Sequence, residues 1–235
     1  MKKIFVVLAL TILIFSCSKE RGNMLVKGQI KGLKKGTLYL QKMNDTIIVS
    51  VDSIQLFDSN EFLLSDNVAS PEMYYLTYSG NKDRKRLMFF GEPGEIVIND
   101  NIDEFGFSPD IKGSKNQEIM DKFNEFNQKF KYKRLDFIAD KFEARSKNDS
   151  MALNTLELEY KKMLRKRYLF TTNFAITHKN SEVAPYLALS ELSDANLYLL
   201  DTINNSLSNH VKNSTYGKRF QKFLSNAKKN ESAQE

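Results

Sequence analysis

The chain has 235 residues, of which 41% are hydrophobic and 27% are charged, and its formal net charge is +6 at pH 7. These proportions are typical of a globular protein, and they exclude long disordered, collagen-like and polytopic membrane proteins. The single cysteine, Cys17, excludes an intramolecular disulfide, a CxxC redox pair and a cysteine-based zinc site.

Residues 1–16 predict a signal peptide. Lys2 and Lys3 form a positive n-region, and Ile4 to Phe15 then runs twelve residues with only Thr11 polar. Twelve apolar residues suit the h-region of a signal peptide but fall short of the ~20 that a membrane-spanning helix needs. The alternative is a buried strand or helix whose end happens to carry the cysteine.

The end of this segment, Ile14-Phe15-Ser16-Cys17, resembles a bacterial lipobox. The resemblance implies cleavage before Cys17 and acylation of its thiol and its new amino group. Two or three acyl chains anchor a protein stably, at ~0.8 kcal/mol for each buried CH₂. Residues 17–23 would then form a lipidated tether. We expect a location in the cell envelope, with the anchor in the outer membrane on its periplasmic or surface face.

Residues 24–113 predict a β-rich domain. Apolar and polar residues alternate as in half-buried strands, and turn residues separate the alternating segments. Strands are expected at 25–30, 37–41, 46–51, 61–64, 73–78, 84–90 and 95–99. Glu92-Pro93-Gly94 has the residues of a type II turn and should reverse the chain between the last two strands. The spacing favours antiparallel sheets in a small sandwich.

Residues 114–227 have a helical period. Ser114-Lys115-Asn116-Gln117 has the form of a capping box, and apolar residues follow it at helical spacing from Ile119 to Phe130. Asn148-Asp149-Ser150 interrupts the first long helix and can cap a second one, so we expect an antiparallel hairpin. Shorter helices are expected at 182–192, 195–207 and 217–227, followed by a flexible tail at 228–235. The predicted fold class is α+β: an N-terminal antiparallel β-sandwich-like domain, then an α-helical hairpin or bundle.

The sequence offers little catalytic chemistry. A Ser-His-Asp or Cys-His site needs a histidine that a carboxylate positions beside the nucleophile, and His178 and His210 both look like surface residues. The glycines at four-residue spacing between positions 28 and 36 lack the lysine of a phosphate-binding loop, and we interpret them as turn residues. The acidic segment 99–104 lacks the glycine of an EF-hand loop. We therefore expect no catalytic residue, no metal site and no cofactor.

The helical region contains the most basic part of the chain. Residues 112–170 include 15 Lys or Arg and 9 Asp or Glu, and the cations cluster at 129–134 and 161–168 with aromatic residues between them. Such patches can bind nucleic acid, anionic headgroups or an acidic partner. Because acids are scattered nearby, we interpret the clusters as solvated helix faces whose long side chains cover apolar surface. Nucleic acid is not an expected partner.

Several segments, spread over nearly the whole mature chain, resemble one known family. They are residues 26–40, 51–54, 90–96, 111–116, 180–186 and 213–218. They resemble an uncharacterised β-rich domain, a domain of unknown function, that lies N-terminally in Bacteroidetes lipoproteins of the thiol:disulfide interchange, thioredoxin-like class. In longer relatives a thioredoxin-like domain with a redox CxxC follows. This chain ends about where that domain would begin, so the resemblance implies the accessory part and not the reductase activity.

Four tripeptides resemble the Asp-Ser/Thr-aliphatic sequon of Bacteroidetes O-glycosylation. The candidate acceptors are Thr46, Ser53, Ser150 and Thr202. The tripeptide around Ser53 also belongs to the strand pattern of the family. Ser150 lies in the expected turn between the two long helices, so we expect it to be the best acceptor.

Three functions are compatible with these observations, in decreasing order. The first is a non-catalytic cell-envelope lipoprotein, a binding or scaffold module of unknown ligand that is held to the membrane by its lipid anchor at Cys17. The second is an accessory subunit working in trans with a thioredoxin-like thiol:disulfide oxidoreductase; its partner would be that enzyme or an outer-membrane protein. The third is a cysteine-free envelope hydrolase. No spacing supports it, because carboxylate pairs about 5–10 Å apart cannot be identified in a sequence.

Overall fold

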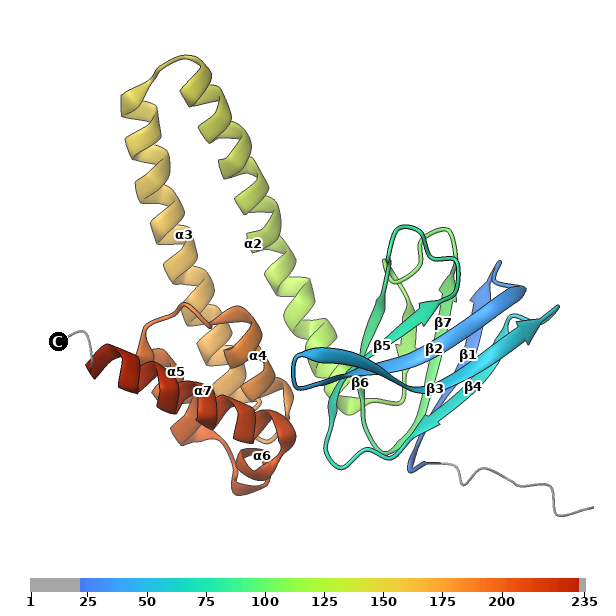
Figure 1. Ribbon diagram of the computed structural model, residues 1–235. Coiled ribbons are helices and arrows are strands. Elements are labelled where there is room, and N and C mark those ends of the chain that lie inside the picture. Colours follow the sequence, from blue (N-terminus) through green and yellow to red (C-terminus); the bar gives the residue numbers. More distant parts are fainter. Residues whose placement is uncertain (1–21, 233–235) are drawn as a thin grey trace, which may run out of the picture.

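A computed structural model describes residues 22–232 and consists of a β-sandwich followed by helices (Figure 1). The predicted α+β class is confirmed. The strands are β1 (Met24–Lys31), β2 (Lys35–Asn44), β3 (Ile47–Phe57), β4 (Glu61–Asp66), β5 (Glu72–Tyr78), β6 (Leu87–Gly91), β7 (Gly94–Asn101) and β8 (Asp110–Lys112). The helices are α2 (Lys115–Ser146), α3 (Ser150–Thr177), α4 (Val183–Glu191), α5 (Leu197–Ser206), α6 (Asn209–Asn213) and α7 (Thr215–Ser232).

The sandwich has two four-stranded sheets, in the orders β4-β1-β7-β8 and β3-β2-β5-β6. Alternate residues of the strands point into the space between the sheets, as the apolar-polar alternation predicts. The side chains that fill this core include Met24, Val26, Leu38, Leu40, Leu64, Leu76, Phe89, Ile96 and Ile98, and each is at most 1% exposed.

Two features of the sandwich differ from the prediction. β1 and β7 pair in parallel, with Met24 opposite Gly94, so the sheets are not wholly antiparallel. The turn at Glu92-Pro93 joins β6 to β7, but these strands lie in different sheets and do not pair with each other. The chain changes sheet at this turn, which allows β7 to return beside the first strand of the domain. The pattern does not predict β8, because three residues are too few to show alternation.

Gly28 lies inside β1, and our interpretation of it as a turn residue is wrong. Its φ is +149°, and a Cβ at this position would lie 1.8 Å from the carbonyl oxygen of Ile98 on β7. The residue is therefore required by the close approach of two strands. Gly36 likewise lies within a strand, β2, and of these glycines only Gly32 lies in the turn.

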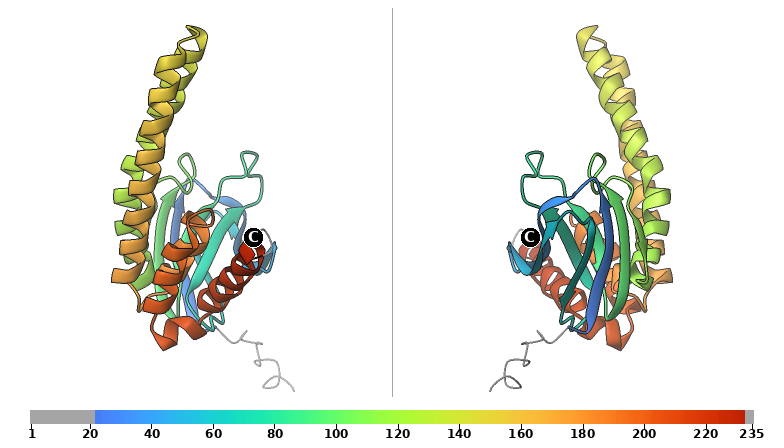
Figure 2. Two further views of the ribbon diagram at one scale, coloured as in Figure 1. Left: turned by 90° about the vertical axis from the view of Figure 1, so that its left-hand side faces the viewer. Right: turned by 90° about the vertical axis from the view of Figure 1, so that its right-hand side faces the viewer.

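Helices α2 and α3 form the expected antiparallel hairpin, which extends well beyond the rest of the molecule (Figures 1 and 2). Both predicted N-caps are confirmed. The Ser114 hydroxyl oxygen accepts a hydrogen bond from the backbone N–H of Gln117, and the Asp149 carboxylate accepts one from the N–H of Ala152. The Gln117 side chain does not complete the capping box, because its carbonyl oxygen accepts a hydrogen bond from the backbone N–H of Phe90.

The shorter helices α4, α5 and α7 correspond to the expected segments, and α6 is an additional five-residue helix. α7 continues to Ser232, so the flexible tail expected at 228–235 is helical over residues 228–232. The Lys228 ammonium lies 2.6 Å from the Asp201 carboxylate, which joins the end of α7 to α5. At the other end, the amide group of Asn23 bonds to the backbone of Val68, so the last residue of the expected tether belongs to the folded domain.

A cluster of aromatic residues joins the helices to the sandwich. The ring of Phe90 on β6 packs edge-to-face against those of Tyr186 and Tyr216, with centroid distances of 5.3 and 6.1 Å. The Tyr216 hydroxyl oxygen also accepts a hydrogen bond of 3.1 Å from the backbone N–H of Met73.

Within residues 22–232, no helix has both the length and the hydrophobicity needed to cross a membrane.

Candidate functional site

The outer half of the hairpin exposes large apolar side chains along one side of α2. Tyr132, Leu135, Ile138 and Phe142 are 60%, 60%, 56% and 76% exposed. At 100° per residue these four positions fall within one third of the helix circumference. We call them the α2 stripe. The buried residues Phe137 and Ala144 lie on another side of α2, so the stripe is separate from the contact between the two helices.

The seam between α2 and α3 is only partly apolar. Phe137 packs edge-to-face on Tyr160 with a centroid distance of 5.8 Å, and Met163 is buried. Lys141 lies in the same row and pairs with Glu157 on α3, its ammonium 3.1 Å from the carboxylate. The seam therefore leaves much of the apolar surface of the hairpin exposed.

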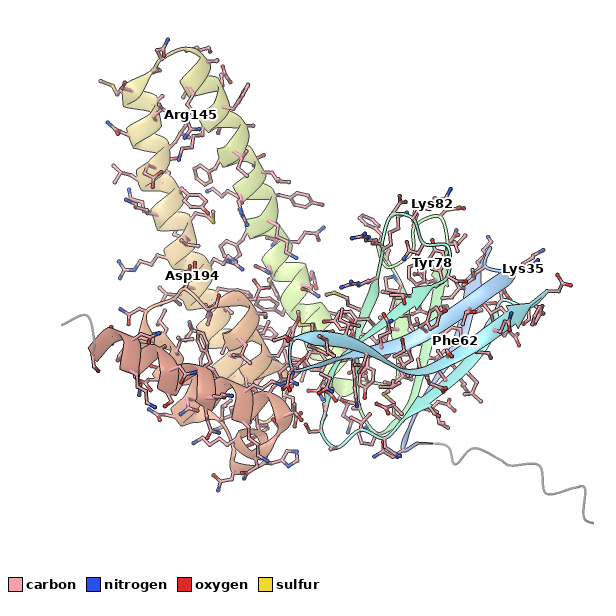
Figure 3. All side chains as sticks on the ribbon, in the orientation of Figure 1. Lys35, Phe62, Tyr78, Lys82, Arg145 and Asp194 are labelled. Carbon is pink, nitrogen blue, oxygen red and sulfur yellow. The ribbon has the colours of Figure 1, made fainter. Side chains whose placement is uncertain are left out.

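A groove separates α2 from α3 beside the stripe. It has a volume of about 330 Å³ and is lined by Arg134, Phe137, Ile138, Lys141, Leu156, Glu157 and Tyr160. Ile138 thus belongs both to the stripe and to the groove wall. Figure 3 shows Arg145 near the far end of the hairpin and Asp194 near its base. The groove lies between these two ends of the hairpin.

The hairpin is strongly basic. Residues 128–167 contain twelve Lys or Arg and six Asp or Glu, a net charge of +6. Three cations on the stripe side of α2, Lys131, Arg134 and Arg145, form no salt bridge with any residue of 22–232. On α3, Lys161 lies 3.9 Å from Glu157, so this one carboxylate faces both Lys161 and Lys141.

The same side of α2 continues inward into a cleft between the helices and the sandwich. The cleft has a volume of about 530 Å³. Its lining includes Met88 and Phe107 from the sandwich, Asp121, Asn124 and Lys131 from α2, and Tyr186 and Glu191 from α4. Phe107 is 86% exposed, and burial raises the pKa of the Asp121 carboxyl above its ordinary value.

Residues of the cleft and of the stripe share a heptad spacing that was not predicted from the sequence. The positions are Gln117, Asp121, Asn124, Gln128, Lys131, Leu135, Ile138 and Phe142, at intervals of 4-3-4-3-4-3-4. The inner positions of this series are polar and the outer three are apolar. The face from Ile119 to Phe130 predicts the helix, and the second 3-4 series is the signal in the sequence that indicates the exposed side.

The polar residues of the family-like segments meet at the base of α2. The Glu92 carboxylate accepts hydrogen bonds from the Lys115 backbone N–H, at 2.7 Å, and from the Asn116 side-chain amide, at 2.5 Å. The Ser181 hydroxyl donates to the Asn116 carbonyl oxygen at 2.6 Å. Asn116 and Ser181, 65 positions apart in the sequence, are thereby joined. The network holds the starts of α2 and α4 and the β6–β7 turn together.

The two histidines lie close to this base, and one of them faces a buried carboxyl. His210 Nε2 is 3.4 Å from Glu182 Oε1, and the Glu182 side chain is only 4% exposed. Burial raises the pKa of Glu182; the nearby His210 opposes this shift, and Glu92 adds to it. His178 is the C-cap of α3, where its half-buried ring stacks on that of Phe174 with a centroid distance of 4.1 Å.

The other predicted positions are distributed over the surface. Thr46 is exposed in the β2–β3 turn, Ser53 is exposed on β3, and Ser150 is exposed at the first position of α3. Thr202 is half-buried, and its hydroxyl donates to the Tyr198 carbonyl oxygen at 2.7 Å. Cys17, the signal peptide and residues 233–235 lie outside the described residues.

Oxygen atoms of the acidic segment 99–104 are used within the loop. The Asp100 carboxylate accepts a hydrogen bond from the Gly106 N–H, and the Asn101 side-chain oxygen accepts one from the Asp103 N–H. Across the described part of the chain, no three His, Cys, Asp or Glu residues gather closely enough to hold a metal ion.

Residues 24–120 match a family model described as Domain of unknown function (DUF4369). The chain therefore carries this domain, and the prediction of an N-terminal domain of unknown function is confirmed. No curated protein matches the chain significantly. The match ends in the second turn of α2, so the α2 stripe and the rest of the hairpin lie beyond it.

Proposed function

We propose that this protein is a non-catalytic lipoprotein of the cell envelope that acts as a binding or scaffold module. Lipid at Cys17 anchors it to the outer membrane, on the periplasmic or surface face, as in the Bacteroidetes lipoproteins that it resembles. Its partner is another envelope protein, either an outer-membrane protein or a thioredoxin-like one. The exposed α2 stripe on the outstretched hairpin is the observation that carries this proposal.

The direction of the hairpin supports a role in reaching a partner. β1 begins at the end of the molecule opposite the α2–α3 turn (Figures 1 and 2). A tether of six residues spans at most about 20 Å, whereas the 32 residues of α2 extend about 48 Å. A chain anchored at Cys17 would therefore hold its sandwich near the bilayer and direct the stripe away from it.

The use of the polar side chains supports a role other than catalysis. Lys42, Asp66 and Tyr74 bond to one another between the two sheets; the Tyr74 hydroxyl donates to Asp66 at 2.6 Å, and the Lys42 ammonium lies 2.7 Å from the same carboxylate. Glu92, Asn116 and Ser181 bond to one another at the base of α2. In both groups each carboxylate is occupied by its neighbours, which is the arrangement of a structural network.

Position-specific crosslinking in cells tests the proposal. A photoreactive residue is placed at Ile138, in the stripe, and at Lys222, an exposed position on α7, and each is combined with native Cys17 or with Cys17→Ala. We expect the native protein in the membrane fraction and Cys17→Ala in the soluble fraction. We also expect one discrete crosslinked product from Ile138 and none from Lys222, with less product in the Cys17→Ala background.

The result distinguishes the functions considered for this chain. An outer-membrane protein in the Ile138 product supports a scaffold, and a thioredoxin-like protein supports an accessory subunit for a thiol:disulfide oxidoreductase. An unchanged membrane fraction for Cys17→Ala would contradict the lipid anchor. The absence of a product specific to Ile138 would contradict a binding role for the hairpin.

A further inference from the structure

We infer that the α2 stripe binds an acidic amphipathic α-helix of a partner protein, which packs in the groove beside α3 and completes a three-helix bundle. The inference rests on the proposed binding function. It adds the surface that binds and the kind of segment that is bound.

The spacing of the stripe indicates that the bound segment is a helix. Leu135, Ile138 and Phe142 follow one another at intervals of three and four residues, the spacing that packs against a neighbouring helix in a coiled coil. A helix that lies along these side chains also covers the groove wall formed by Leu156 and Tyr160 on α3. An amphipathic helix that docks in an apolar groove between two helices is a recurrent mode of recognition.

The ends of the stripe set the length of the bound helix. From Lys131 to Phe142 the α2 axis advances about 17 Å, which corresponds to three turns of a partner helix. At the inner end, Lys131 faces the cleft that Phe107 and Met88 line on the sandwich side. The sandwich therefore limits the bound helix there, whereas the outer end beyond Phe142 is open.

The charges beside the groove indicate that the bound helix is acidic. Arg134 and Arg145 lie between the stripe and α3, and Lys141 and Lys161 share the single carboxylate of Glu157. Charges that flank an apolar seam select the partner, because opposite charges attract and like charges repel across the seam. Glutamate or aspartate side chains along the bound helix would pair with the unpaired guanidinium groups.

The same charges disfavour a second copy of this chain. Two stripes that pair about an antiparallel two-fold axis bring identical edges together, so that Arg134 and Arg145 of one copy would face the same residues of the other. Each hairpin also carries a net charge of +6 over residues 128–167. An acidic partner compensates this charge, whereas a second copy doubles it.

Peptide binding to the mature chain carrying Cys17→Ala tests the inference. The probe is a fluorescent 21-residue peptide of three heptads, with Leu at a and d and Glu at e and g; repulsion between the Glu residues disfavours pairing of the peptide with itself. Its counterpart has Lys in place of Glu. We expect the acidic peptide to bind with 1:1 stoichiometry, at least tenfold more tightly than the basic one, and more weakly as the salt concentration rises.

Two matched variants locate the binding surface. Leu135→Ser/Ile138→Ser/Phe142→Ser should weaken binding of the acidic peptide at least tenfold. Met151→Ser/Leu158→Ser, which removes exposed apolar side chains from the outward face of α3, should leave binding unchanged. Because all five side chains are exposed, circular dichroism spectra and melting temperatures should match the parent chain for both variants.

Several results would overturn the inference. In the peptide assay they are no binding of the acidic peptide, equal binding of both peptides, or binding that survives the triple substitution. Dimerisation of the chain in sedimentation velocity that the triple substitution abolishes would indicate a second copy instead. Cosedimentation with phosphatidylglycerol vesicles that depends on the stripe would indicate a lipid surface instead. A product from Ile138 in cells, combined with failure of the peptide, would retain the proposed binding function and reject only the acidic helix. Peptide binding without any product in cells would reject the proposed function in the cell instead.

Discussion

Glu92 and Asn116 are bonded side chain to side chain, with the Asn116 amide donating to the Glu92 carboxylate at 2.5 Å. The same carboxylate accepts the backbone N–H of Lys115, a group at the start of α2 that has no partner within its own helix. A carboxylate at a helix N-terminus also interacts favourably with the helix dipole. Glu92 therefore fixes the start of α2 from the β6–β7 turn, and with it the direction in which the hairpin leaves the sandwich.

Replacing Glu92 by Gln should destabilise the protein. The substitution removes the negative charge and replaces one acceptor oxygen by an NH₂ group, a donor that would face other donors. We therefore expect a loss of about 1–2 kcal/mol in the free energy of unfolding, measured by urea denaturation. Glu95→Gln is the control. Glu95 forms a salt bridge with Lys27 in which both side chains are about half exposed, at 52% and 47%, and such pairs contribute little. Equal stability of the two variants would contradict the role assigned to Glu92.

Glu182 should make the stability of the protein depend on pH. Burial raises the pKa of its carboxyl, so the folded state binds this proton more tightly than the unfolded state does. The contribution of Glu182 is therefore fully present below its unfolded pKa and is lost as the pH rises through its folded pKa. Glu182→Gln cannot ionise, so we expect it to melt at a higher temperature than the parent chain at pH 7.5. The difference should vanish below about pH 4.

Thermal melts at both pH values check this expectation, with the exposed residue Glu159 changed to Gln as a control that should show no such dependence. His210 is the group that could reverse the sign, because its ring faces the Glu182 carboxylate at 3.4 Å. A lower melting temperature for Glu182→Gln at pH 7.5 would mean that the interaction with His210 outweighs the cost of burial.

Gly28→Ala should separate β1 from β7. The new Cβ would overlap the Ile98 carbonyl oxygen, and φ of +149° is also strained for alanine. We therefore expect the free energy of unfolding to fall by about 3 kcal/mol or more. Gly80→Ala is the control, since Gly80 also has a positive φ of +83° but has no atom near its Cβ position. It should lose only about 1 kcal/mol from backbone strain. Similar losses for both variants, measured by chemical denaturation, would show that the strand contact is unimportant.

O-glycosylation at Ser150 is a prediction that intact mass can check. Ser150 is exposed at the end of the hairpin, beside the N-cap residue Asp149. The protein purified from its native host should exceed the mass of the acylated polypeptide, and Ser150→Ala should lose the increment of one glycan. The control is Ser146→Ala, which changes another exposed serine at the same turn that is not preceded by an aspartate. This variant should keep the mass increment of the glycan. A native mass equal to that of the acylated polypeptide would refute glycosylation at all four candidate positions.

Elements that depend on neighbouring residues could be predicted from the sequence. The strand segments, the Ser114 and Asp149 caps and the long hairpin all arise from local periodicity, from residues three or four positions apart, or from one side chain bonding to a nearby backbone N–H. The polar base of the hairpin could not be predicted, because Glu92, Asn116 and Ser181 lie in three separate segments. Each of these residues is unremarkable in its own segment.

By itself, the sequence determined most of the strands and helices, though not β8 or α6, where the two long helices begin, and that the chain has an α+β fold. The tertiary structure alone decided the parallel pairing of β1 with β7, the requirement for glycine at position 28, and which apolar side of α2 is buried against α3 and which remains exposed. For α2 the physical reason is that apolar residues follow a 3-4 spacing on two sides of the helix, from Ile119 to Phe130 on one side and from Leu135 to Phe142 on the other. Periodicity records that a face is apolar, but only contacts between distant segments decide whether another part of the chain covers it.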